Sequence, residues 1–507
     1  MTQLIAALFL VLFAAAMVFV GVKSAKKTLT MDGFLLGGRN IGPWISAFAY
    51  GTSYFSAVIL IGYAGKTGWQ VGIGGIWIGV GNALVGCLLG WLLLAGRTRS
   101  MTHSLGAATM PEFFEKRYLS KAMKIYSAVI IFVFLVPYCA TVYKGLGYLF
   151  SQIFPIFGDN ANVACMFIIA LLTAIYLVLG GYVATAVTDF VQGIIMIFGV
   201  IIMVVSIANN PVSGGFAEGF AKIRELGAAD GVDSLSLFGG SQMKFLLMNT
   251  LLTSIGALGL PQMIHKFYAI SDKKQISKAA IVSTFFALII GVGAYMAGTF
   301  GRLYLGNKLP ENNYDLVVPT MLMKAFSHTV FGNIVLSIIL LLVLSASMST
   351  LSSLALTSSS AIAVDLVGAA KPDFDKLKQM RLMRTLCFVF VALSFVFATF
   401  KFAFIMQLMS FSWGVVAGCF IGPYIWGLYG KGITRAGAWC GILSGVAVVG
   451  AMTVFYTMTA GFGVALTNIQ NAGVAAMVVS MIVTPLVSLF TKKYDSEHIS
   501  RVFSEVE

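Results

Sequence analysis

Long apolar segments, separated by short polar connections, run through almost the whole chain. The first covers residues 4–22, and twelve more are centred near residues 55, 84, 136, 170, 197, 256, 288, 347, 391, 415, 446 and 481. Because a helix rises about 1.5 Å per residue, about 20 apolar residues cross the hydrocarbon core of a bilayer. The pattern therefore predicts an all-α polytopic membrane protein with about 13 transmembrane helices.

Composition and charge support this class. Hydrophobic residues make up 59% of the chain and charged residues only 10%, which would leave a soluble globular protein with an apolar surface. The net charge of +14 could suggest a nucleic-acid partner, but 24 of the 33 Lys and Arg residues lie in connections that the span order places on one side. One such connection contains Lys266, Lys273, Lys274 and Lys278. Because basic connections face the cytoplasm, we expect a multi-pass protein of the cell (inner) membrane and no nucleic-acid partner.

The first span also orients the chain. It is too long for the apolar part of a signal peptide, and its positive charges follow it rather than precede it. We therefore expect the span to stay, with the N-terminus outside and, after an odd number of spans, the C-terminus in the cytoplasm. Residues 156–162 and 209–242 are predicted outer surface loops, and residues 110–118 a short interfacial helix that begins with a proline.

Two spans are interrupted by residues that weaken a helix. Residues 50–56 bring a glycine and hydroxyls into the second span, and residues 254–262 bring two glycines and a proline into the seventh. Either alone could be a packing kink. Together they open two blocks of five spans, which indicates an inverted repeat with binding sites between the breaks. The predicted parts are a first helix and inner loop (1–42), repeat one (43–210), an outer loop (211–242), repeat two (243–430), and two last helices with a cytoplasmic tail (431–507).

Hydroxyl side chains line one face of the ninth span. Ala346, Ser349, Thr350 and Ser353 follow the i, i+3, i+4, i+7 spacing of a helix face, and Ser352 extends it. Close helix packing could explain any single hydroxyl, because Ser and Thr are common at helix contacts in lipid. For the whole cluster, neutral oxygens on one face favour a site for a hard cation.

Asp189 is the acidic residue that the pattern places inside a span, about a turn into the sixth span from the inner side. Nearly all other acids, such as Asp365 at a helix end, belong to connections, helix ends or tails. A carboxylate inside a membrane is costly and is by default a functional candidate, although a protonated or hydrogen-bonded Asp could also support the helix start. Ser352 and Ser353 fall in the same inner half of the membrane, which favours a cation site with one formal charge.

Four segments together resemble the sodium:solute symporter family, over about residues 5–490. They are residues 34–39 (FLLGGR), 188–193 (TDFVQG), 346–353 (ASMSTLSS) and 434–441 (TRAGAWCG). The resemblance is to bacterial members of the pantothenate and proline type. It implies a leucine-transporter-type fold of five plus five helices, and secondary active uptake driven by co-transported sodium ions.

The resemblance also implies two sodium sites. The first would use the backbone carbonyls of Thr52, Phe55 and Ala346 and the hydroxyls of Ser349 and Thr350. The second would use Asp189, Ser349, Ser352 and Ser353.

A candidate solute pocket collects side chains from several spans, each of which could instead be a helix contact. They are Tyr54, Ser56, Asn82, Thr253, Ser254, Gln262, Gln407, Ser410 and Trp413. Lys144, in the outer half of span four, either extends to the outer surface or pairs with a solute carboxylate. Proline-transporting members of the family carry an aspartate where this chain has Tyr54, and residues 259–262 and 297–302 look more like pantothenate-type members.

Energetics bear on the solute. One sodium ion entering through about 100 mV and a tenfold gradient releases about 3.7 kcal/mol, whereas a monoanion costs about 2.3 kcal/mol to import. Two sodium ions therefore suit an anionic solute. We expect a symporter that imports a small, carboxylate-bearing solute (pantothenate, a monocarboxylate or an amino acid) with two sodium ions by alternating access. A proton-coupled transporter and a passive channel are the alternatives, and an enzyme would need a second catalytic group near Asp189.

Overall fold

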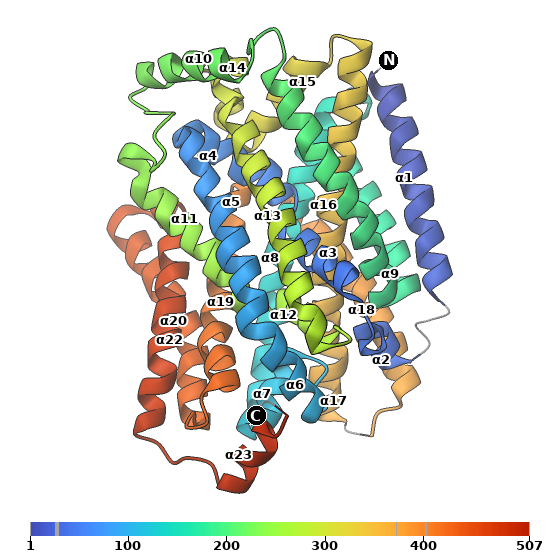
Figure 1. The fold of residues 1–507 in the computed structure, drawn as a ribbon, viewed down its shortest axis with the longest axis vertical. Coiled ribbons are helices and arrows are strands. Elements are labelled where there is room, and N and C mark those ends of the chain that lie inside the picture. The colour runs from blue at the N-terminus through green and yellow to red at the C-terminus, as the bar shows by residue number, and fades with distance from the viewer. Residues whose placement is uncertain (1, 26–29, 372, 401–402, 506–507) are drawn as a thin grey trace.

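The computed structural model describes residues 2–25, 30–371, 373–400 and 403–505. These residues form helices and connections, with one isolated backbone bridge between Ile41 and Ile270. Figure 1 shows most of the long helices side by side, running between the two ends of an elongated bundle. The predicted all-α class is confirmed.

The α-helices carry the labels of Figure 1 and have the following bounds. They are α1 (Thr2–Ala25), α2 (Met31–Leu36), α3 (Pro43–Tyr54), α4 (Ala64–Gln70), α5 (Ile76–Gly81), α6 (Gly96–Ser104), α7 (Met110–Tyr118), α8 (Lys121–Ile153), α9 (Ala161–Ala208), α10 (Phe216–Ala229), α11 (Met243–Gly256), α12 (Pro261–Tyr268), α13 (Ile276–Thr299), α14 (Gly301–Leu305), α15 (Val317–Phe326), α16 (Val330–Ser360), α17 (Val367–Ala370), α18 (Lys376–Thr399), α19 (Ile405–Tyr429), α20 (Arg435–Ala460), α21 (Phe462–Thr467), α22 (Ile469–Leu489) and α23 (Ser496–Phe503).

Within the described residues, ten helical segments are long and apolar enough to cross a membrane, and the number is twelve if each of two bent helix pairs is one span. The predicted fifth span corresponds to a shorter apolar stretch, Ala161–Ile175, at the start of α9. Gly181, with a φ of 50°, kinks α9 after this stretch. The protein therefore has the helices of a multi-pass membrane protein, while the total of 13 spans stays a prediction.

The two predicted broken spans are present. The pair Pro43–Tyr54 and Val58–Gln70 is bent by 47°, and the pair Gly240–Gly259 and Pro261–Tyr268 by 43°. In each, one residue with extended backbone angles, Phe55 or Leu260, ends the first helix. Pro261 then begins α12, since proline is accepted in a first helical turn. Whether the two blocks are inverted repeats stays a prediction.

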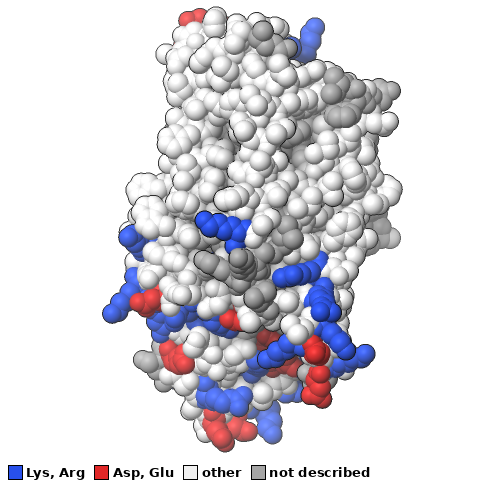
Figure 2. Space-filling view, turned by 90° about the vertical axis from the view of Figure 1, so that its right-hand side faces the viewer, with Lys and Arg blue, Asp and Glu red and all other residues white. Residues whose placement is uncertain are grey.

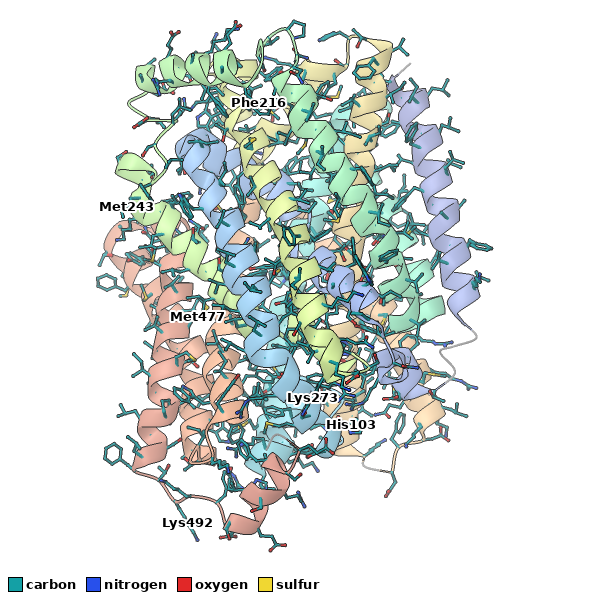
Figure 3. All side chains as sticks on the ribbon, in the orientation of Figure 1. His103, Phe216, Met243, Lys273, Met477 and Lys492 are labelled. Atoms are coloured by element: carbon teal, nitrogen blue, oxygen red, sulfur yellow. The ribbon has the colours of Figure 1, made fainter. Side chains whose placement is uncertain are left out.

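Charge separates the two ends of the bundle. Figure 2 shows Lys and Arg gathered toward its lower end, and Figure 3 places His103, Lys273 and Lys492 at that end and Phe216 at the other. The predicted interfacial helix is α7, with the predicted bounds and with Thr109 capping its first turn. The predicted outer loop 209–242 contains a helix of its own, α10. Helix α1 begins at the end of the bundle opposite α23 (Figure 1).

Burial distinguishes a central layer from the periphery. In α16 and α19, 83% and 94% of the most apolar stretch is buried, whereas in α1 and α20 only 22% and 28% is buried. Small residues allow central helices to pack closely. A Cβ atom on Gly79 would lie only 2.6 Å from the backbone of Gly291 on α13. The hydroxyl-rich helix α16 thus lies inside the protein, against both α3 and α9.

Candidate ion and solute sites

The break after α3 exposes backbone carbonyls to α16. The last carbonyls of a helix have no partner within it, and α3 ends at Tyr54. The Ser349 hydroxyl lies 2.9 Å from the Thr52 carbonyl oxygen and 3.0 Å from that of Ala346. The Thr350 hydroxyl lies 3.4, 3.3 and 3.1 Å from the carbonyl oxygens of Thr52, Ser53 and Ala346. The structure thus brings together the oxygens predicted for the first sodium site, apart from the Phe55 carbonyl, and adds the Ser53 carbonyl.

These oxygens have more lone pairs than protons. Two hydroxyls take part in five close oxygen–oxygen contacts but carry only two protons, so the protons cannot serve all five as full hydrogen bonds. In an octahedral shell with a metal–oxygen distance of about 2.4 Å, neighbouring oxygens lie about 3.4 Å apart. The spacing and the surplus of lone pairs therefore fit a small hard cation.

The predicted second site differs because it contains a lysine. The ammonium of Lys266, on α12, lies 3.6 Å from the Asp189 carboxylate and donates a hydrogen bond of 3.0 Å to Ser353. Asp189 is fully buried and Lys266 is 2% exposed. The Ser53 and Ser353 hydroxyls are hydrogen-bonded to each other at 2.8 Å. This buried ion pair joins α9, α12 and α16.

The other two predicted ligands of the second site point elsewhere. Ser352 donates to the carbonyl of Ser349 in its own helix, at 3.0 Å, and the Ser349 hydroxyl belongs to the oxygen cluster of the first site. A sodium ion on the Asp189 carboxylate would lie about 6 Å from the ammonium, a repulsion of about 3 kcal/mol at an effective dielectric constant of about 20. The Lys266 ammonium therefore lies where the sequence predicts a second sodium ion, and that ion stays a prediction.

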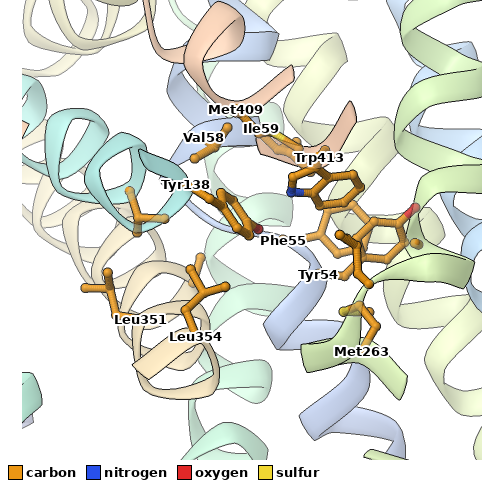
Figure 4. Packing of buried hydrophobic residues seen from close by; sticks show 14 of the residues in the cluster. Tyr54, Phe55, Val58, Ile59, Tyr138, Met263, Leu351, Leu354, Met409 and Trp413 are labelled. Carbon is orange, nitrogen blue, oxygen red and sulfur yellow. The ribbon is translucent and has the colours of Figure 1, made fainter. Parts of the chain in front are cut away.

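Aromatic and aliphatic side chains from several helices pack together around Tyr54 and Trp413 (Figure 4). The Tyr54 and Trp413 rings are stacked with centroids 6.0 Å apart, and Tyr138 meets Trp413 edge-on at 5.8 Å. The Tyr54 hydroxyl donates to the carbonyl of Thr253 on α11, at 2.7 Å. All three rings are buried.

Comparison with known proteins shows to which family the chain belongs. Residues 34–445 match the sodium:solute symporter family. The chain belongs to this family. It is a membrane transporter, and sodium is the ion that it co-transports.

Relatives of this symporter match over nearly the full chain. The osmoregulated proline transporter OpuE of Bacillus subtilis is 28% identical over 490 residues, 95% of this chain and 94% of that protein. A sodium/proline symporter of Haemophilus influenzae is 30% identical over 448 residues, 88% of this chain and 86% of that protein.

Solved structures support the fold. A Na⁺-coupled sialic acid symporter in a substrate-bound, outward-open state has a TM-score of 0.77 over 97% of this chain and 98% of that one, at 18% identity. The nucleobase-cation-symport-1 family transporter Mhp1, closed with bromovinylhydantoin bound, has a TM-score of 0.52 over 92% and 97%, at 12% identity. At these identities the likeness concerns the fold alone.

Several polar residues predicted for the solute pocket of the symporter bind to other parts of the protein. Asn82 accepts hydrogen bonds from Thr253 at 2.8 Å and from Ser254 at 3.1 Å. Two more act at helix starts: Ser56 accepts from the Val58 backbone, and Gln407 from the backbone of Phe404. Ser410 shares a hydrogen bond of 3.0 Å with Tyr63. Each of these four side chains thus binds another part of the protein, although the amide nitrogen of Asn82 has no hydrogen-bond partner among the described residues.

Gln262 stands apart from these residues. It lies in the first turn of α12, it is 1% exposed, and neither end of its side-chain amide has a hydrogen-bond partner among the described residues. A buried amide without a partner is costly unless a ligand or water satisfies it. Gln262 is therefore the polar pocket candidate that is most available to a solute.

Lys144 lies under the outer connections rather than at an open surface. It is 4% exposed, and its ammonium donates to the carbonyl of Ala403, just before α19, at 3.4 Å. Nearby, in the connection between α14 and α15, Asp315 accepts the backbone N–H of Ile405 at 3.0 Å. Burial raises the pKa of Asp315 to about 6, while the Ile405 N–H, Lys144 and Lys66 act to lower it. Asp315 is not among the site residues predicted from the sequence, and it follows the short helical turn at Pro310–Asn312.

Two sequence expectations about charged residues are wrong. Lys266 was expected in a cytoplasmic connection, but it lies within α12, five residues after Pro261. The signal was the distance from the proline, because a half-helix beginning there extends past residue 266. Asp189 is also not the sole buried acid among the described residues. Asp365 is fully buried and accepts a hydrogen bond of 2.7 Å from Thr109, and Asp315 is 2% exposed.

Proposed function

We propose that this symporter imports a small organic solute into the cytoplasm by alternating access, driven by a sodium ion bound between α3 and α16. The N-terminus faces the outside and the C-terminus the cytoplasm, since the basic end of the bundle carries α23. The observation that carries the proposal is the cluster of five close oxygen–oxygen contacts around Ser349 and Thr350.

The cluster suits coupling because it joins two parts of the fold. Thr52 lies beside the break of the second span, whereas Ser349 and Thr350 lie on a continuous helix. A cation shared by both favours the arrangement in which they meet, and loss of the ion frees them to separate. Ion and solute then stabilise the same conformation, which is linkage between two ligands and two states.

We propose a carboxylate-bearing solute, with an amino acid as the leading candidate. The unpartnered amide of Gln262 and the N-terminal end of the half-helix α12 can both donate to a carboxylate, and Tyr54 and Trp413 offer an apolar wall. The relatives named above are proline transporters. Proline is therefore the first compound to test, followed by pantothenate and monocarboxylates.

A second sodium ion at Asp189 remains a prediction from the sequence, and the position of Lys266 argues against it. A proton-coupled transporter and a passive channel remain the competing functions. Neither function requires the oxygen cluster. A channel needs no ion that links two conformations, and a proton needs no set of carbonyl ligands around it.

The test is solute uptake into proteoliposomes that contain the purified protein. Each candidate solute is offered with an inward gradient of sodium, of choline, or of protons in choline, at a fixed membrane potential. We expect accumulation above the external concentration with sodium alone. Equal uptake in sodium and choline would refute sodium coupling, and accumulation driven by protons in choline would favour the competing transporter. Equilibration without accumulation would indicate a channel.

A further inference from the structure

The Asp189 pocket already contains a cation that belongs to the protein. The ammonium of Lys266 lies 3.6 Å from the Asp189 carboxylate and 3.0 Å from the Ser353 hydroxyl, and 5.2 Å from the centre of the Tyr182 ring. A lysine ammonium has three donors and one positive charge. It therefore offers this pocket what a bound monovalent ion would offer, except that the charge is attached to α12.

We infer that Lys266 is the resident cation of the Asp189 pocket, and that the symporter consequently couples one sodium ion to each solute molecule. This inference rests on the proposed function and adds the number of ions. It differs from the two sodium ions expected from the sequence.

The surrounding hydrogen bonds support this assignment. Of the four residues expected to ligate a second ion, Ser352 donates to its own helix backbone and Ser349 belongs to the first site. The remaining two, Asp189 and Ser353, are the two that contact Lys266. Neither Asp189 oxygen has a hydrogen-bond partner among the described residues, so the ammonium 3.6 Å away is the cation that balances this carboxylate.

Charge balance leads to the same conclusion. One carboxylate and one ammonium, both fully or almost fully buried, make a neutral pocket. Buried charges in a membrane interior are found paired with each other. A sodium ion added to this pair would leave one net positive charge in a region that excludes water.

The number of ions bears on the class of solute. With about 100 mV and a tenfold sodium gradient, one sodium ion supports about 500-fold accumulation of a solute without net charge, but only about tenfold accumulation of a monoanion. A single-ion symporter therefore suits a zwitterion, in which the carboxylate is balanced within the solute. Gln262 can bind such a carboxylate without supplying a charge of its own.

The first experiment measures charge and solute together in the wild-type protein. Proteoliposomes are held at a fixed potential, and current is recorded while uptake of a labelled zwitterion from the panel is counted. We expect one positive charge for each molecule taken up. Two charges for each molecule would overturn the inference, although sodium-driven uptake itself would still stand. Absence of sodium-dependent uptake for every solute would instead refute the proposed function.

The second experiment removes the resident cation. Lys266→Met retains much of the apolar stem and leaves the Asp189 carboxylate without its partner, so a second sodium ion should now bind. We expect two charges per zwitterion and a Hill coefficient for sodium that rises from about one to about two. Lys266→Arg keeps the positive charge, so this variant should still move one charge per zwitterion. A Lys266→Met protein that transports with one charge per molecule would show that Lys266 does not exclude a second ion.

A matched control separates charge from general damage. Lys278→Met makes the same substitution at an exposed position of α13, and it should leave the charge ratio at one. If Lys266→Met does not fold, a high-resolution structure of the wild type in sodium chloride shows which cation contacts Asp189. An ammonium in contact with the Asp189 carboxylate supports the inference, and an ion on that carboxylate with Lys266 displaced overturns it.

Discussion

The two predicted sodium sites of this symporter look alike in sequence and differ in the structure. Both draw on hydroxyls of α16 between residues 349 and 353, and Ser349 is predicted for both. At the first site the facing element is the broken end of α3, which offers carbonyl oxygens. At the second it is α12, which offers an ammonium. A row of hydroxyls therefore does not determine which cation it meets, because the opposite helix decides.

The largest expected effect concerns the ion pair of the second site. Asp189→Asn leaves the Lys266 charge buried without its counter-ion, and loss of one partner of a buried pair typically costs about 3–5 kcal/mol. We expect a marked loss of thermal stability in detergent. The double variant Asp189→Asn/Lys266→Met removes both charges and should recover most of it. Equal melting temperatures for the wild type and Asp189→Asn would show that the pair is not an energetic unit.

The next effect separates the two sites on one helix. Ser349→Ala removes a hydroxyl from the first site, whereas Ser352→Ala removes one that donates only to its own helix backbone. Losing a hydrogen-bonding partner of a charged group costs about 1.5–3 kcal/mol. We expect the sodium concentration for half-maximal uptake to rise about tenfold or more for Ser349→Ala.

Ser352→Ala and Ser337→Ala serve as controls, since Ser337 on the same helix also donates only to a backbone carbonyl, that of Asn333. In both variants the sodium concentration for half-maximal uptake should stay within about twofold of the wild-type value. Removing one such hydrogen bond changes the free energy of the protein by about 0.5 kcal/mol, at the low end of measured values. If the sodium concentration for half-maximal uptake rose as much in Ser352→Ala as in Ser349→Ala, the hydroxyls of Ser349 and Ser352 would act together in a second ion site.

The solute site should respond separately from the ion sites. Gln262→Ala removes the unpartnered amide, so we expect the KM for a carboxylate solute to rise about tenfold at saturating sodium, which corresponds to about 1.4 kcal/mol. Sodium binding in the absence of solute should not change. Kinetic assays at several sodium concentrations separate the two effects, and an unchanged KM would remove Gln262 from the solute site.

The smallest effect lies at the outer end. The pKa of Asp315 is about 6, above the ordinary value of about 3.8, so the native carboxyl holds its proton to higher pH than the unfolded one. Its contribution to stability therefore falls as the pH rises from about 4 to about 6. The melting temperatures of the wild type and of Asp315→Asn are compared at each pH. We expect the gap between them to change by a few degrees from about pH 4 to about pH 6. A constant difference would show that Asp315 titrates alike in both states.

Much of the fold could be predicted because lipid constrains the sequence strongly. Apolar runs mark the spans, and the residues at 50–56 and 254–262 mark the breaks, since Gly, Pro and hydroxyl residues weaken a helix locally. The hydroxyl face of α16 followed from the helical period. In each case the information is local, within one or two turns of a single helix.

The remaining features depend on contacts between helices. Lys266 was assigned to a connection because charge usually marks the end of a span, and its pairing with Asp189 joins residues 77 apart in sequence. Asn82 was predicted to line a solute pocket, but its side-chain oxygen accepts hydrogen bonds from Thr253 and Ser254. Polar groups in a membrane interior commonly form hydrogen bonds between helices. Such pairings cannot be obtained from the pattern of one span.

Equilibrium binding of radioactive sodium to the purified, solute-free protein counts the ions that one chain holds. We expect one saturable sodium site per wild-type chain, weakened about tenfold or more in Ser349→Ala and unaffected in Ser352→Ala. Two sites in the wild-type protein, or one site that Ser349→Ala leaves intact, would contradict it.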